Sequence, residues 1–97
     1  MDFSVSVRWT NQAVTDLEEI LQYLEEAWTS KEVEKFKLKL GKDIDLLTKF
    51  PYLGSASKSK KDLRRFVLNK HVTIIYQFEI DTISIISLFQ NVRKPKF

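Results

Sequence analysis

The feature that most constrains the fold is a change in the spacing of apolar residues along the chain. Apolar and polar residues alternate over 3–9, then apolar residues recur at helical spacing over two segments, and alternation returns in the C-terminal third. A period of two places side chains on alternate faces of a strand, whereas a period of 3.6 forms a stripe on a helix. The order therefore predicts one strand, two helices and then further strands.

The first helical segment is expected over residues 11–28. Thr10 and Asn11 stand at its start, where their side-chain oxygens can accept hydrogen bonds from free backbone N–H groups. Aspartate and glutamate occupy the faces away from its apolar stripe. We expect an amphipathic helix whose acidic outer face is a poor surface for phosphate.

The second helical segment begins at a capping box formed by Thr29 and Glu32. It is expected to end near Phe50, because Pro51 disfavours helical geometry in the residue before it. Gly41 lies inside this segment, where glycine costs about 1 kcal/mol relative to alanine, and close packing against the first helix would explain it. Because the break between the helices is so short, they are predicted to form an antiparallel hairpin.

Three further strands are predicted, over residues 65–69, 71–80 and 83–90. A turn-rich and lysine-rich loop over 51–63 precedes them. Two-residue hairpin turns are predicted at Asn69-Lys70 and Asp81-Thr82, because asparagine and aspartate tolerate the left-handed backbone that such turns need. These strands should form an antiparallel meander.

Together these elements predict a single α+β domain over residues 1–97, in the order β-α-α-β-β-β. A helical hairpin would pack on one face of a small antiparallel sheet, with the first strand at an edge. A chain of 97 residues is long enough for one hydrophobic core and too short for two.

The composition excludes several classes of site. The chain has no cysteine, so disulfides, thiolate metal sites and cysteine catalysis are excluded. It has one histidine, His71, and no zinc-binding or phosphate-loop pattern. The first residues, MDFSVSVRWTN, lack the basic start and apolar core of a signal peptide, and no apolar run approaches the roughly 20 residues of a membrane helix. We expect a cytoplasmic protein with no metal, no small-molecule cofactor and no membrane partner.

The strongest functional signal is the clustering of basic residues in a chain of net charge +3. One group lies before and at the start of strand 65–69, and the other lies at the C-terminus. The groups are Lys58, Lys60, Lys61, Arg64 and Arg65, and Arg93, Lys94 and Lys96. We expect the start of strand 65–69 and the end of strand 83–90 to lie at the same end of the sheet, so that both groups line one surface. Such a surface would attract phosphates or an acidic protein segment; the alternative is a solvated surface without function.

Within the first group, Arg64 and Arg65 are expected on opposite sides of a strand. A guanidinium on a rigid element can bind a phosphate through two hydrogen bonds. We predict that Arg65 faces the site; the alternative is an ordinary salt bridge to a glutamate. His71 is expected to be an exposed turn residue far from Arg65.

The aromatic residues fall into two sets. Those at core spacing are expected to be buried, and they are Trp9, Trp28, Phe36, Tyr76 and Phe78. Tyr52 and Phe97 are expected to be accessible, where either would stack on a base or anchor a partner; the alternative for each is plain surface.

Four segments together resemble the RelE/ParE toxin superfamily. WTNQAVTDLEEILQYL is similar to the family's first strand leading into a helix, and FPYLG to its "FP.LG" at the close of the helical hairpin. RRFVLNKHVTIIYQF resembles its arginine-led strand, turn and strand, and ISIISLFQNVRKP resembles its last strand and tail. The resemblance covers nearly the whole chain, and it depends on the order and spacing of these segments.

The resemblance implies a growth-inhibiting toxin of a plasmid-stabilisation type, neutralised by a cognate antitoxin. One branch of the superfamily cleaves messenger RNA on the ribosome and another poisons DNA gyrase. For RNA cleavage it implies Arg65 and Arg93 as catalytic residues on the phosphate, with Lys60 or Lys61 in a lysine role.

The sequence departs from the RNA-cleaving pattern at one position. Gln90 or Asn91 stands where that branch often has a histidine, and an amide cannot exchange a proton near neutral pH. This difference and the FPYLG turn favour a ParE-like, gyrase-directed toxin. The alternatives are a RelE-like endoribonuclease and a non-toxic binding module of the same fold.

Overall fold

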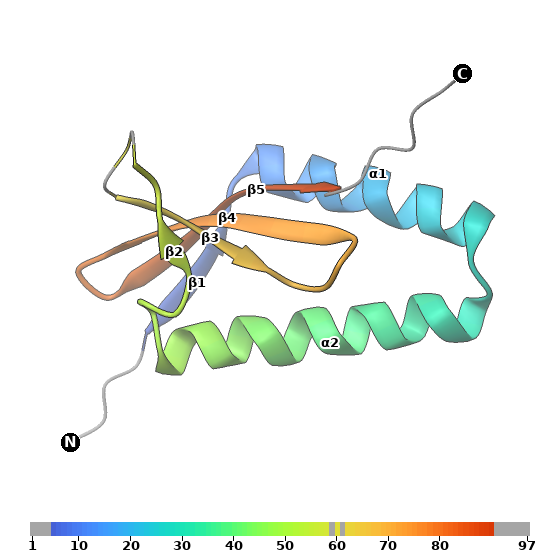
Figure 1. The fold of residues 1–97 in the computed structure, drawn as a ribbon, viewed down its shortest axis with the longest axis horizontal. Coiled ribbons are helices and arrows are strands. Elements are labelled where there is room, and N and C mark those ends of the chain that lie inside the picture. Colours follow the sequence, from blue (N-terminus) through green and yellow to red (C-terminus); the bar gives the residue numbers. More distant parts are fainter. Residues whose placement is uncertain (1–4, 59, 61, 91–97) are drawn as a thin grey trace.

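The computed structural model describes residues 5–58, 60 and 62–90, which form two helices packed on a five-stranded sheet (Figure 1). The elements in chain order are β1 (Ser6–Trp9), α1 (Asn11–Ala27), α2 (Ser30–Lys49), β2 (Ser55–Ala56), β3 (Leu63–Val67), β4 (Val72–Glu79) and β5 (Thr82–Gln90). The predicted α+β order is confirmed, and β2 is a short additional strand within the predicted loop.

The sheet has the strand order β1-β5-β4-β3-β2. Its β3-β4-β5 part is the predicted antiparallel meander, and β1 lies at the predicted edge. However, β1 pairs with β5 in parallel, so the sheet is mixed rather than antiparallel throughout. Only tight turns force neighbouring strands to be antiparallel, and β1 is separated from β5 by two helices and by strands β2, β3 and β4.

The strand register corrects the predicted positions of the strand ends. Leu63, at the start of β3, pairs with Gln77 of β4. On its other side Gln77 pairs with Ser84, near the start of β5. At the other end of the sheet, Val67 and Phe89 lie on either side of the same β4 residue. The chain reverses direction between β3 and β4 and again between β4 and β5, so β3 and β5 run in the same direction. The expectation that the start of β3 lies beside the end of β5 is therefore wrong.

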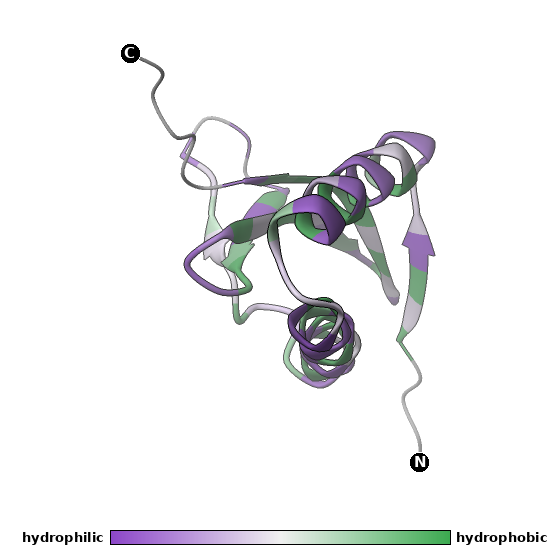
Figure 2. Ribbon diagram, turned by 90° about the vertical axis from the view of Figure 1, so that its right-hand side faces the viewer, coloured by the Kyte–Doolittle hydropathy of each residue, from purple (hydrophilic) through white to green (hydrophobic). Residues whose placement is uncertain are grey.

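The hydrophobic core lies between the helices and the sheet. The buried residues are Ala13, Ile20 and Leu24 of α1, Val33, Phe36, Leu40 and Leu47 of α2, and Leu68, Val72, Ile74, Tyr76, Ile83, Ile85 and Leu88 of the sheet region. Trp9, Trp28 and Phe78 are partly buried and pack against this core. Figure 2 shows hydrophobic residues along the strands, and around both helices hydrophobic and hydrophilic residues alternate. The predicted burial is confirmed for Phe36 and Tyr76, whereas the other three aromatic residues contact the core and stay partly exposed.

Both helix starts are capped as predicted. The Thr10 hydroxyl accepts a hydrogen bond from Ala13 N at 3.1 Å and lies 2.9 Å from Ile86 O, to which it donates. Thr29 and Glu32 form the complete capping box, each side chain accepting from the other residue's backbone N–H at 3.2 Å. The hydrogen bond from Thr10 therefore also links the start of α1 to β5. The capping box at Thr29 lies at the short connection between the two antiparallel helices (Figure 1).

Gly41 is exposed on α2 and does not pack closely against α1. A Cβ atom added there would meet nothing within 4 Å. The predicted explanation for this glycine is wrong, and nothing in the structure requires glycine at this position.

The two hairpin turns work differently from each other. Asn69 is at its predicted turn, and its side-chain oxygen accepts hydrogen bonds from His71 N at 2.7 Å and Val72 N at 3.0 Å. In the β4–β5 turn the left-handed residue is Ile80, with φ of 60°, rather than Asp81. Because Glu79 pairs with Thr82, this turn begins one residue earlier than predicted.

Candidate functional site

The loop of residues 50–54 is bound to the sheet by the hydroxyl of Tyr76. This hydroxyl donates a hydrogen bond to Pro51 O at 2.7 Å and accepts one from Gly54 N at 2.9 Å. The Tyr76 side chain is fully buried. Burial raises the pKa of Tyr76 above its ordinary value of 10.0, so the hydroxyl retains the proton that it donates.

Arg64 binds the same loop from β3. Its Nη1 atom donates to Gly54 O at 2.7 Å and to Tyr52 O at 3.3 Å. The guanidinium carbon lies 4.9 Å from the centroid of the Tyr52 ring, a cation–π distance. The edge of Tyr52 also meets Phe78, with ring centroids 5.4 Å apart. Tyr52 is thereby held in place although it is 68% exposed, and its predicted accessibility is confirmed.

Gly54 lies where the loop approaches the sheet most closely. A Cβ atom at this position would lie 2.8 Å from Arg65 O and 2.8 Å from two atoms of the Tyr76 ring and hydroxyl. Any side chain would therefore have to displace either the β3 backbone or the Tyr76 contact. The glycine of FPYLG is explained by this close approach.

Arg65 lies on the other side of β3, as the predicted alternation requires. It is exposed, and it is neighboured in the sheet by Ser55 and Ile75. Among the residues that the structure describes, Arg65 forms no salt bridge, so the alternative of an ion pair to a glutamate is not found there.

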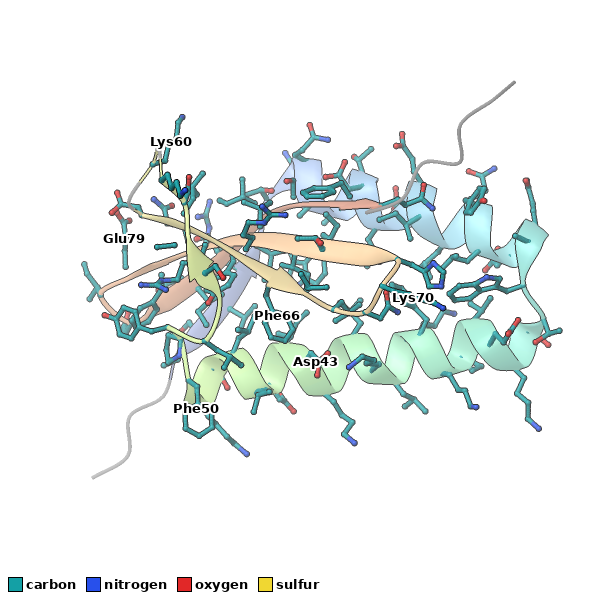
Figure 3. All side chains as sticks on the ribbon, viewed as in Figure 1. Asp43, Phe50, Lys60, Phe66, Lys70 and Glu79 are labelled. Atoms are coloured by element: carbon teal, nitrogen blue, oxygen red, sulfur yellow. The ribbon has the colours of Figure 1, made fainter. Side chains whose placement is uncertain are left out.

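We use the name basic cluster for Lys58, Lys60, Arg64 and Arg65. Lys58, Arg64 and Arg65 line a shallow hollow of about 420 Å³ together with Ser55, Ser57 and Ile75. Lys60 is exposed and projects from the segment between β2 and β3 (Figure 3). The remaining predicted site residues, Lys61, Arg93 and Lys94, lie outside the described residues, as does Phe97.

The basic cluster offers cationic groups, and Ser55 and Ser57 add hydroxyls to the hollow. Arg64 is committed to loop carbonyls, which leaves Arg65 and the two lysines as its accessible cations. His71 lies at the β3–β4 turn, where it is half-buried and its ring packs edge-on against Trp28 at 5.3 Å. His71 is at the predicted turn, but the prediction that it is exposed is corrected. Chemically, the cluster can bind a phosphate or a carboxylate.

Sequence reasoning assigned Tyr76 to the core but missed what its hydroxyl does. A buried tyrosine hydroxyl needs hydrogen-bond partners, and this need was the available signal. Within the described part of the chain, no group of three metal-ligating side chains occurs, and no described helix has the length and apolar character of a membrane span.

Solved structures share this fold. One, from the chromosomal ParDE toxin–antitoxin system of P. aeruginosa, matches with a TM-score of 0.74 and 16% identity over 92% of this chain and 98% of its own. A copper-bound mutant toxin from Helicobacter pylori matches with a TM-score of 0.64 and 15% identity over 89% and 93% of the two chains. A conserved hypothetical protein from Helicobacter pylori matches with a TM-score of 0.59, 18% identity and the same coverages. The fold is thus one found in small toxins.

The family assignment comes from the sequence profile. The family described as the ParE toxin of the type II toxin–antitoxin system, parDE, matches residues 7–93. No curated protein sequence matches the chain. The chain belongs to the ParE toxin family, which confirms the expected RelE/ParE-type toxin.

Proposed function

We propose that this toxin inhibits growth by binding DNA gyrase in the cytoplasm, and that a cognate antitoxin neutralises it. The observation that carries the proposal is the chemistry around Arg65. The described residues lining its hollow supply cations, serine hydroxyls and apolar groups. Among the described lining residues there is no histidine or carboxylate, the side chains that most often carry out the acid–base steps of RNA cleavage. This chemistry is suited to holding a macromolecule.

The distribution of charge supports an acidic antitoxin segment. The outer side of α1 exposes Glu18, Glu19, Glu25 and Glu26, whereas β2, β3 and their connection expose Lys58, Lys60 and Arg65. Val67 and Phe89 are 57% and 41% exposed on the same side of the sheet as Arg65. An acidic or amphipathic segment across the helical hairpin and the sheet edge would mask both charge and apolar area.

The first experiment separates the two possible targets. The protein is induced in a host without antitoxin, and translation and DNA damage signals are followed separately. A gyrase-directed toxin should raise DNA damage signals while protein synthesis continues. Purified protein should also inhibit supercoiling by purified gyrase, and unaffected supercoiling would reject the proposal.

A RelE-like endoribonuclease is the second candidate, favoured by one observation. Arg65 is an exposed guanidinium beside Lys58 in a hollow, which is a suitable arrangement for a phosphate. This candidate predicts rapid loss of protein synthesis and cuts within ribosome-bound messages. Replacing Arg65 and Arg93 with alanine should abolish the cuts, and cuts that persist would reject this site. Harmless expression without antitoxin would instead indicate a non-toxic binding module.

A further inference from the structure

One end of the molecule carries an apolar pocket that the basic cluster does not include. The pocket has a volume of about 730 Å³ and lies between the end of α2, the loop 50–54, the β4–β5 turn and the residue before β1. Its apolar lining is formed by Val5, Pro51, Tyr52, Phe78 and Ile80, and Thr48, Lys49 and Asp81 line it as well. Phe50 projects from the same end of α2 (Figure 3).

Large apolar side chains are exposed around this pocket. The exposed fractions are 58% for Phe50, 68% for Tyr52 and 94% for Ile80. A single exposed apolar residue needs no explanation, but a group of them around a pocket marks an interaction site. We call Phe50, Tyr52, Ile80 and the pocket walls the apolar end.

Ile80 is unfavourable in two independent ways. Its side chain is almost fully exposed, and its φ of 60° is a left-handed conformation that β-branched residues rarely adopt. A two-residue hairpin turn with positive φ at its first residue normally has glycine there. Nothing in the described fold requires isoleucine at this position. Strained residues of this kind cluster at active sites, ligand clamps and switch regions.

The Tyr52 side of the apolar end is held in place by contacts with the rest of the fold. Tyr52 is held between Arg64 and Phe78, and its loop is bound to the sheet through Tyr76. A surface that is already ordered loses little conformational entropy when a partner binds. Tyrosine and arginine are also the residue types enriched among those that contribute most to binding at protein interfaces.

We infer that the apolar end is a docking site for a protein partner that presents a bulky apolar side chain flanked by carboxylates. The apolar side chain would enter the pocket between Tyr52 and Ile80. Carboxylates are matched by Lys49, which lines the pocket and forms no salt bridge among the described residues. A nucleic acid backbone would make no use of Ile80 or Phe50. The inference rests on the proposed function in that the partner is the toxin's target.

The test uses a substitution that separates stability from binding. Ile80→Gly removes the anchor and supplies the residue that the turn favours. It should therefore raise the melting temperature by about 4 °C while weakening binding to purified gyrase about tenfold or more. Tyr52→Ser should weaken binding similarly, and Ile80→Leu should retain it. Leu38→Ser is the matched control, because Leu38 is 69% exposed on α2 and does not line the pocket.

The outcomes distinguish this inference from the proposed function. If wild-type protein inhibits gyrase and Ile80→Gly inhibits it equally, the inference falls and the proposed function stands. If wild-type protein arrests growth but does not affect gyrase, the proposed function is rejected. In that case, loss of growth arrest in Ile80→Gly but not in Leu38→Ser supports the inference. Equal arrest by both variants, or a wild-type protein without effect on gyrase or growth, overturns it. Binding to a short DNA duplex that depends on Ile80 would also overturn it, because the partner would not be a protein.

Discussion

The two sides of β3 carry the same residue type and use it differently. On one side, Arg64 donates to two loop carbonyls and covers Tyr52, next to the buried Tyr76 hydroxyl. On the other side, Arg65 is exposed and forms no salt bridge with the described residues. The comparison teaches that a cluster of charges in the sequence can contain a structural residue next to an exposed one, and that strand alternation separates them.

The largest expected effect concerns the loop of residues 50–54, which Arg64 and Tyr76 bind. Gly54→Ala should lower the free energy of unfolding by about 3 kcal/mol, because the new Cβ atom would overlap the β3 backbone and Tyr76. Urea denaturation measures the change. Gly41→Ala is the matched control: it should raise stability by about 1 kcal/mol, because Gly41 lies in an exposed helix with open space around it. Equal effects at the two glycines would contradict this account of the loop.

The next largest effect concerns the Tyr76 hydroxyl. Tyr76→Phe should cost about 2 kcal/mol, because the Gly54 N–H and the Pro51 carbonyl would both lose their partner. Chemical denaturation near neutral pH measures the loss. Tyr23→Phe is a suitable control, since Tyr23 is 54% exposed and its substitution should change stability little. A similar loss from both variants would count against the loop anchor.

A smaller effect is expected from pH. The pKa of Tyr76 is raised by burial, so above its ordinary value of 10.0 the unfolded chain loses this proton before the folded protein does. The stabilisation from Tyr76 is therefore fully present below that pH and is lost as the pH rises toward the folded pKa. The stability difference between wild type and Tyr76→Phe should narrow from about pH 8 to about pH 11. A constant difference would mean that Tyr76 ionises equally in both states.

Much of the fold could be predicted because its signals are local. The Thr29–Glu32 capping box, the stop at Pro51 and the alternation in β4 each depend on a few neighbouring residues. The parallel direction of β1 could not be predicted in this way, because it depends on how two helices return the chain to the sheet. The turn at Ile80 was misplaced because isoleucine gives no sequence signal for a left-handed backbone.

The candidate site was predictable in composition but not in the roles of its residues. Alternation alone placed Arg64 and Arg65 on opposite sides of a strand. The partners of Arg64 are loop carbonyls ten and twelve residues away, and only the folded loop brings them within reach. The expected meeting of both basic groups required β3 and β5 to run in opposite directions, whereas the register makes them run the same way.

The most direct test of the central claim compares Arg64→Ala with Arg65→Ala in one pair of measurements, unfolding free energy and growth arrest after induction. We predict that Arg64→Ala lowers stability by about 1.5 kcal/mol, whereas Arg65→Ala changes it by less than about 0.5 kcal/mol. We also predict that Arg65→Ala reduces growth arrest although it is fully folded. An Arg65→Ala protein that is as toxic as wild type, or an Arg64→Ala protein that is as stable as wild type, would contradict the division of roles across β3.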